Sequence, residues 1–282
     1  MTNFQEMAQE IKNLTPIPAV TMSLLKVVED PNKTMDDVTN IIQYDPAITA
    51  DVLRSANSAY FGLKYPAETI SDAAKMLGTD RLVELVLLKV ASKIIQGPLD
   101  GYGMHEGALW KHSVSSAIIA KQVAVQLGLS HSCTIFTAAL LKDIGKTVMD
   151  KYVQNAYKKI YKLVINENFS FMEAETKVIG VNHAELGGMM AQIWKFSPKM
   201  VRIINNHHLP REDMVKDKDT IVVYLADCIC MMMGMGIGAD GLAYRFHHQA
   251  IEKIGISADD ILTIIVNFTP QMKEVEKLLK MV

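Results

Sequence analysis

The sequence is short of cysteine, of net charge and of any export signal, and each shortage excludes a class of protein. Its three cysteines among 282 residues, two of them in Cys228-x-Cys230, do not make a disulfide framework and indicate reduced thiols in a cytoplasmic protein. A formal net charge of -2 offers no basic field to a phosphate backbone, so we expect no nucleic-acid partner. The N-terminal residues lack the basic and apolar regions of a secretory signal.

One apolar run, from Ile221 to Ala239, approaches the length of a membrane span and contains a single charge, Asp227. Its second half includes Met-Gly-Met-Gly-Ile-Gly, and each interior glycine destabilises a helix by about 1 kcal/mol relative to alanine. We therefore expect a buried core helix over 220–233 that ends in a glycine loop, and no membrane segment.

Helical patterns recur along the chain, whereas no stretch alternates apolar and polar residues as a strand does. Capping patterns that open helices occur at Thr34-x-x-Asp37, Ser170-x-x-Glu173 and Asn182-x-x-Glu185. The sequence predicts an all-α fold. The glycine-rich stretch from Gly97 to Gly107 predicts a boundary between two helical lobes, residues 1–98 and residues 107–282. In the second lobe we expect helices over 109–127, 132–146 and 150–166.

The expected helix over 132–146 contains an unusual pair of charges, Lys142 and Asp143, in an otherwise apolar run. Buried charges are costly unless they are paired or bound to metal, so the pair indicates an ion-pair network or a functional site. Residues of metal-ligand type could converge on it: His112, His183, His207, His208 and Asp227. The alternative is that these side chains are hydrogen-bonded packing residues around an internal salt bridge, without any ligand.

Several motifs follow one another along the chain, among them Asp45-Pro-Ala-Ile-Thr49, Leu109-Trp-Lys-His-Ser113, Leu140-Leu-Lys-Asp-Ile-Gly-Lys146 and His207-His208-x-Pro210. In this order they resemble the HDOD domain, the HD-related output domain of bacterial signalling proteins. The resemblance extends from about Leu14 to Asp227 and implies a single HDOD unit with two helical lobes. It also implies that the second lobe is similar to the metal phosphohydrolases of the HD superfamily.

The resemblance implies a set of metal ligands and one departure from it. In the HD superfamily a histidine, a His-Asp pair and a later aspartate hold the metal, and these match His112, Lys142-Asp143 and Asp227. His183, His207 and His208 match the extra ligands of the related HD-GYP phosphodiesterases. Asp143 is the candidate catalytic residue. After His208 the chain continues Leu-Pro-Arg-Glu in place of Asp-Gly-x-Gly-Tyr-Pro, which weakens the case for cyclic dinucleotide cleavage.

Lys142 stands where the family has the histidine of its name. A protonated lysine has no lone pair to donate to a metal. At about 4 Å from a divalent ion, with an effective dielectric constant near 20, the repulsion would be on the order of 8 kcal/mol. We therefore expect the ammonium to neutralise Asp143 or Asp227 in place of a cation. A second position, built from His183, His207, His208 and Asp143, keeps a divalent metal ion as a candidate cofactor.

Two functions follow as hypotheses. The first is a non-catalytic signalling module of the bacterial cytoplasm, which binds a protein partner or a small ligand in the former active-site cleft. The second is a metal-dependent phosphohydrolase that acts on a nucleotide or another phosphoester. The sequence leaves open whether the protein is an enzyme.

Overall fold

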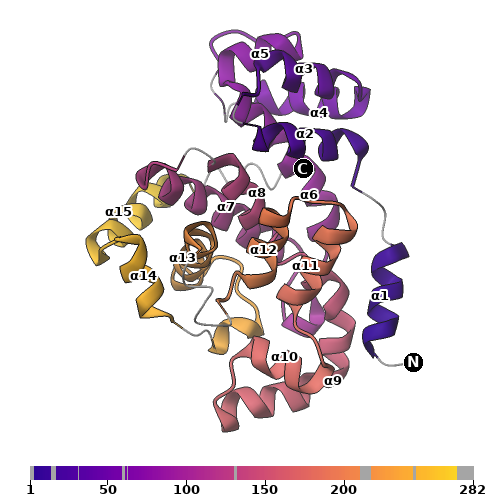
Figure 1. The fold of residues 1–282 in the computed structure, drawn as a ribbon, viewed down its shortest axis with the longest axis vertical. Helices are drawn as coiled ribbons and strands as arrows, with labels where there is room; N and C mark the ends of the chain where they lie inside the picture. Colours follow the sequence, from indigo (N-terminus) through magenta and orange to yellow (C-terminus); the bar gives the residue numbers. More distant parts are fainter. Residues whose placement is uncertain are drawn as a thin grey trace.

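The computed structural model describes residues 3–13, 17–30, 32–58, 61, 63–129, 132–209, 217–243 and 246–271, and its named elements are all helices (Figure 1). The prediction of an all-α fold is confirmed. The α-helices are α1 (Asn3–Asn13), α2 (Ala19–Glu29), α3 (Met35–Gln43), α4 (Pro46–Ala56), α5 (Ile70–Leu77), α6 (Thr79–Ile95), α7 (Ala108–Gln126), α8 (Ser132–Leu141), α9 (Lys146–Glu167), α10 (Phe171–Ile179), α11 (His183–Ile193), α12 (Pro198–Asn206), α13 (Lys218–Met232), α14 (His248–Ile254) and α15 (Ala258–Phe268). Short 3₁₀ helices include η1 (Asp100–Tyr102) and η3 (Ala239–Ala243).

Local capping explains where several of these helices begin. The three capping boxes predicted at Thr34, Ser170 and Asn182 are formed at the starts of α3, α10 and α11. In each, the cap side chain accepts a hydrogen bond from a backbone N–H of the first turn, and the acidic side chain at that position accepts one from the cap residue. The box at Asn182 fixes where α11 begins, and therefore where His183 lies.

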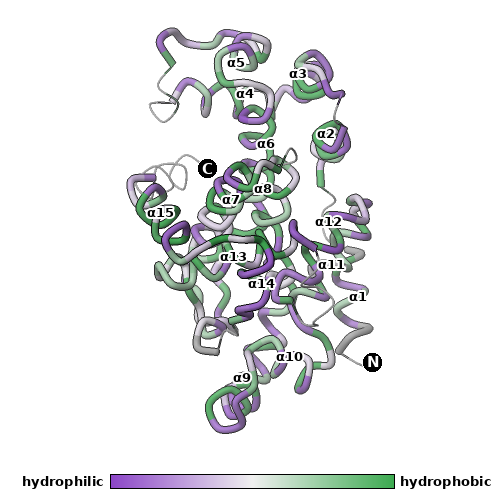
Figure 2. The backbone as a smooth tube through the Cα atoms, turned by 60° about the vertical axis from the view of Figure 1, so that its left-hand side comes forward, coloured by the Kyte–Doolittle hydropathy of each residue, from purple (hydrophilic) through white to green (hydrophobic). Residues whose placement is uncertain are grey.

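The helices gather in two regions. Helices α2 to α5 lie together at one end of the molecule, and α6 packs against α2, α4 and α5 while also contacting α7 and α8 (Figure 1). Helix α1 lies beside α9 in the other region, where the Lys151 ammonium is 2.6 Å from the Glu10 carboxylate. Hydrophobic segments concentrate in α6, α7, α8 and α13 at the centre (Figure 2).

The glycine-rich segment 97–107 is attached to the second region. Gly101 donates its backbone N–H to Asp150 of α9 at 2.8 Å, and a Cβ atom on Gly101 would lie 2.2 Å from the Asp150 carbonyl oxygen. Only glycine allows so close an approach. This contact carries the next residue, Tyr102, into the core, where its side chain is fully buried.

The prediction of one helix over 132–146 was wrong. Helix α8 ends at Leu141, α9 begins at Lys146, and the residues between them form a turn. Its backbone hydrogen bonds span three residues, as from the Lys146 N–H to the Asp143 carbonyl at 2.9 Å. A Cβ atom on Gly145 would lie 2.0 Å from the His183 carbonyl oxygen, so glycine lets the turn and α11 come together. The turn directs the neighbouring side chains Lys142 and Asp143 to one place.

Helix α13 is the core helix expected over 220–233, and glycine follows its end: Gly234 and Gly236 have positive φ angles of 70° and 63°. A Cβ atom on Gly236 would lie 2.2 Å from the Ala108 carbonyl oxygen, so the loop approaches α7 closely. None of the described helices combines the length and the apolar character that crossing a membrane requires.

Candidate metal centre

Four predicted site residues meet in the first of two adjoining groups. The lysine cluster comprises His112 from α7, Lys142 and Asp143 from the turn between α8 and α9, and Asp227 from α13; each side chain is at most 3% exposed. The Lys142 Nζ atom lies 2.6 Å from Asp227 Oδ1 and 3.0 Å from His112 Nε2, and it also contacts Asp143 Oδ2. Asp227 Oδ1 lies 2.7 Å from His112 Nε2. The Lys142 ammonium therefore contacts each of the three predicted metal ligands in the lysine cluster.

His112 is held from the other side of its ring. Its Nδ1 atom donates a hydrogen bond to the Met235 carbonyl oxygen at 2.9 Å, since a carbonyl can only accept. Met235 belongs to the glycine loop after α13, and the close approach of Gly236 to α7 makes this contact. The glycine loop therefore orients His112 with Nε2 toward Asp227 and Lys142.

The charges of the lysine cluster stabilise one another. Burial by itself would lower the pKa of Lys142, but the carboxylates of Asp143 and Asp227 raise that pKa above its ordinary value. Burial would raise the pKa of both carboxyl groups, yet the Lys142 ammonium holds each pKa well below its usual range. The lysine is therefore protonated and both carboxyl groups are ionised at neutral pH.

The lysine cluster does not fit a divalent ion. The ligand atoms of His112, Asp143 and Asp227 lie within 4.8 Å of one another, as metal ligands do. The Lys142 ammonium, however, contacts each of them and would stand against any ion placed there. The protein's own cation takes this position.

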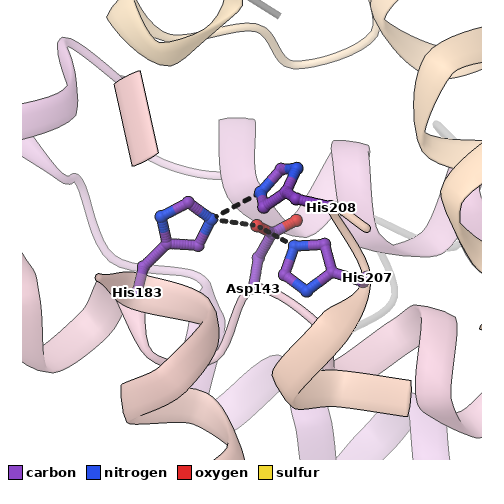
Figure 3. A group of neighbouring side chains, drawn as sticks. All are labelled: Asp143, His183, His207 and His208. Atoms are coloured by element: carbon purple, nitrogen blue, oxygen red, sulfur yellow. Dashed lines mark hydrogen bonds and ion pairs between the residues drawn. The ribbon is translucent and has the colours of Figure 1, made fainter. Parts of the chain in front are cut away.

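The second group, the histidine cluster, comprises Asp143, His183, His207 and His208 (Figure 3). His183 is the first residue of α11, and the two adjacent histidines lie in the turn after α12. Nε2 of His183 is 2.8 Å from Nε2 of His208 and 3.7 Å from Asp143 Oδ1. One ligand atom from each of the four residues lies within 4.8 Å of the others.

His207 provides the test of whether the histidine cluster fits a metal ion. Its Nδ1 atom donates to the Ile204 carbonyl at 2.8 Å, which leaves a lone pair on Nε2. That nitrogen is buried without a hydrogen-bond partner among the described residues, and Asp143 Oδ1, at 3.7 Å, is too distant for one. Burial lowers the pKa of His207, and burial with the neighbouring histidines holds the pKa of His208 well below its usual range. Neutral imidazoles aimed at a carboxylate fit a metal ion.

Four residues around the clusters were missed or given no role by sequence reasoning: Tyr102, Lys146, Glu175 and Asp240. Lys146 Nζ lies 2.9 Å from Asp143 Oδ1 and 2.6 Å from Asp240 Oδ2. Glu175, in α10, contacts Nδ1 of His183 at 2.7 Å. A signal existed for Lys146, which closes the Leu140–Lys146 motif, and for Asp240, which follows the glycine loop. The helical period of α10 gives no sign that Glu175 is special.

A cavity of about 480 Å³ opens beside the histidine cluster. His183 and His208 form part of its wall, together with residues of α10 and with Asp240 from η3. This volume lies within the range of small-molecule sites in proteins. The lysine cluster takes no part in the lining, so a ligand in this cavity would meet the histidines first.

Comparisons with known proteins agree with this architecture. The family model of the HDOD domain matches residues 14–210. An HDOD domain protein from Geobacter sulfurreducens is 22% identical, with 98% of this chain and 96% of that chain covered and a TM-score of 0.75. A candidate phosphohydrolase from Shewanella amazonensis is 25% identical, with 97% of both chains covered and a TM-score of 0.68.

Two further relatives differ in length from this chain. A candidate signal transduction protein from Marinobacter aquaeolei is 16% identical, with 99% of this chain and 65% of that chain covered and a TM-score of 0.73. An uncharacterized protein of Treponema pallidum is 24% identical over 202 residues, which make up 71% of this chain and 39% of the relative. This chain thus spans about two fifths of that curated relative.

Proposed function

This chain belongs to the HDOD family, and we propose on that premise that it is a signalling module without hydrolytic activity, which acts by binding a protein partner or a small ligand. The observation that supports this proposal is the Lys142 ammonium, which contacts His112, Asp143 and Asp227. A metal hydrolase needs lone pairs at these positions to hold an ion that activates water. The three buried free cysteines accord with a reducing compartment such as the bacterial cytoplasm.

The cavity beside the histidine cluster is the place that we propose for a small ligand or for a side chain of a partner. Its wall combines apolar side chains, among them Phe171 and Met172, with polar groups from α10 and from His183, His208 and Asp240. This combination is typical of binding pockets, in which apolar walls provide affinity and a few polar groups fix the orientation of the ligand. Nucleic acid is not among the partners that we propose, because the chain has no net positive charge.

The test is a hydrolysis screen on the full chain, purified without an affinity metal and supplied in turn with Mg²⁺, Mn²⁺ and Zn²⁺. The substrates are phosphodiesters, phosphomonoesters and nucleotides, and the Asp143→Ala protein is measured in parallel. We expect the natural chain and the variant to give the same background rate. Turnover by the natural chain that disappears in Asp143→Ala would overturn the proposal.

A metal-dependent phosphohydrolase is the second candidate. The observation that favours it is the Nε2 atom of His207, which has no hydrogen-bond partner in the described part of the chain. His183, His207, His208 and Asp143 would hold one ion, whose contribution is to acidify a bound water. Similarity to the Shewanella amazonensis protein, a candidate phosphohydrolase, agrees with this alternative.

The number of metal ions bound per chain tests whether Lys142 keeps an ion out of the lysine cluster. The Lys142→His variant restores a lone pair in the lysine cluster, so we expect it to bind about one more ion per chain than the natural protein. Plasma mass spectrometry after dialysis against Mn²⁺ or Zn²⁺ measures the difference. Equal metal content in the two proteins would show that Lys142 does not exclude the ion.

A further inference from the structure

Two buried residues, Tyr102 and Glu175, lie beside the His183 ring, and Glu175 contacts the nitrogen opposite the one that faces the histidine cluster. The Tyr102 hydroxyl donates to Glu175 Oε1 at 2.6 Å. Glu175 Oε2 lies 3.0 Å from the backbone nitrogen of His183 and 2.7 Å from its Nδ1 atom. The Tyr102 ring also stands at 89° to the His183 ring, with 6.2 Å between their centres. Within the described part of the chain, the Glu175 carboxylate thus has three hydrogen-bond donors.

These contacts determine which nitrogen of His183 carries the hydrogen. An ionised carboxylate only accepts hydrogen bonds, so Nδ1 must be the donor. In the neutral ring, Nε2 is then left with its lone pair, and this nitrogen faces His208 Nε2 at 2.8 Å and Asp143 Oδ1 at 3.7 Å (Figure 3). The hydrogen bond from Nδ1 to Glu175 therefore leaves Nε2 as the acceptor nitrogen.

Packing alone does not account for a carboxylate at this position. Both Tyr102 and Glu175 have no exposed surface, and a buried carboxylate is costly unless its hydrogen bonds are satisfied. Among the described residues, His183 is the one basic side chain within ion-pair distance of Glu175. An apolar side chain would fill the space without this cost. The side chain that is present, however, fixes the His183 ring.

We propose that Glu175 and Tyr102 are positioning residues, which hold the His183 ring so that Nε2 is an acceptor directed into the histidine cluster. Glu175 acts on the ring directly, and Tyr102 holds the Glu175 carboxylate through its second oxygen. Metal-binding histidines commonly donate their other N–H to a carboxylate, and removing that partner lowers metal affinity about 10–100-fold. The proposal rests on the candidate metal position of the histidine cluster, although the position of the ring hydrogen can be measured without metal.

The first test reads the hydrogen position directly, by long-range ¹H–¹⁵N NMR of the histidine rings in the full, metal-stripped chain. The measurement is made at a pH of about 8.5, two units above the ordinary histidine pKa of about 6.5, and His183→Gln assigns the signal. We expect the His183 hydrogen on Nδ1 in the natural chain. Glu175→Ala should produce a mixture of both tautomers, and Glu175→Gln, which keeps an acceptor oxygen, should restore the natural form.

A matched control comes from an exposed glutamate. Glu167→Gln makes the same chemical change at the exposed end of α9. It should leave the His183 signal unchanged. A His183 hydrogen on Nε2 in the natural chain would overturn the proposal, and so would an unchanged signal in Glu175→Ala. If that variant does not fold, the natural chain and Glu175→Gln decide the result.

The second test measures Mn²⁺ and Zn²⁺ affinity by calorimetry. We expect Glu175→Ala to bind about 10–100-fold more weakly than the natural chain, because the His183 ring loses the acceptor that holds it, and Glu167→Gln to bind normally. Equal affinity in Glu175→Ala would contradict the positioning role. If the natural chain takes up neither ion, the candidate metal position fails, and the NMR result alone decides whether Glu175 orients His183.

Discussion

The two clusters share one carboxylate and use it in different ways. In the lysine cluster, Asp143 meets the Lys142 ammonium, and the cation is part of the chain. In the histidine cluster, the same Asp143 faces His207 Nε2, which has no hydrogen-bond partner among the described residues. The charges of the first group are paired and its residues do not line the cavity, whereas the second group has a lone pair without a partner among the described residues and lies beside the cavity. The position of the Lys142 ammonium thus distinguishes an internal ion-pair network from a candidate binding site.

The largest effect is expected from removing the cation of the lysine cluster. Lys142→Met keeps much of the side-chain volume but leaves the ionised carboxylates of Asp143 and Asp227 without the ammonium that both contact. Removing one partner from a buried ion pair costs about 3–5 kcal/mol. We expect the free energy of unfolding, measured with urea, to fall by about that amount.

The matched control is Lys158→Met, which makes the same change at an exposed position of α9. It should alter stability by less than about 0.5 kcal/mol. Equal stabilities for Lys142→Met and the natural chain would mean that the lysine cluster does not depend on its ammonium, and the contrast between the two clusters would then disappear.

A smaller effect is expected from separating the turn that carries Asp143 from the helix that carries His183. In Gly145→Ala the new methyl group would lie 2.0 Å from the His183 carbonyl oxygen and 2.6 Å from the Gly187 nitrogen, so the backbone must move. Overpacking of this kind costs about 1–3 kcal/mol. Thermal or urea unfolding measures the loss.

Gly97→Ala provides the comparison for that variant, because a Cβ atom at this position has no atom within 4 Å from the described residues beyond its own chain neighbours. We expect little change in its stability. If Gly145→Ala were as stable as Gly97→Ala, the close approach of the turn to α11 would not be what holds the two clusters together.

The sequence predicted the members of both clusters but not the geometry that joins them. Lys142 and Asp143 stood out because two charges in an apolar run need partners, and Asp227 stood out for the same reason. The turn at 142–145 was not predicted. Gly145 is required by a close contact with α11, and the neighbouring residues in the sequence do not indicate that contact. The hydrogen bond from Tyr102 to Glu175 joins positions 73 residues apart, beyond what local patterns report. The capping boxes were predicted correctly because each lies within one helical turn.

The two clusters should also respond to acid at different pH values. Burial lowers the pKa of His207, so below the ordinary histidine value of about 6.5 the unfolded chain binds protons more readily than the folded chain, and stability falls as the pH falls. Asp143 and Asp227 differ from His207 in this respect. Burial would raise the pKa of each carboxyl group, but the Lys142 ammonium holds each pKa well below its usual range. Their contribution is complete above the ordinary carboxyl pKa of about 4 and is lost only below it.

Urea unfolding of the metal-stripped chain between about pH 7.5 and pH 5 isolates the histidine part of this dependence, because the carboxylates keep their full contribution there. We expect His207→Gln to remove part of the acid-induced loss, on the order of 1 kcal/mol over this range, since a neutral amide binds no proton in the unfolded chain. The exposed His105 gives the control variant His105→Gln, which should keep the natural dependence. If the stability of His207→Gln fell with pH as much as that of the natural chain, the buried His207 imidazole would not be held neutral. The histidine cluster would then lack the free lone pair that distinguishes it from the lysine cluster.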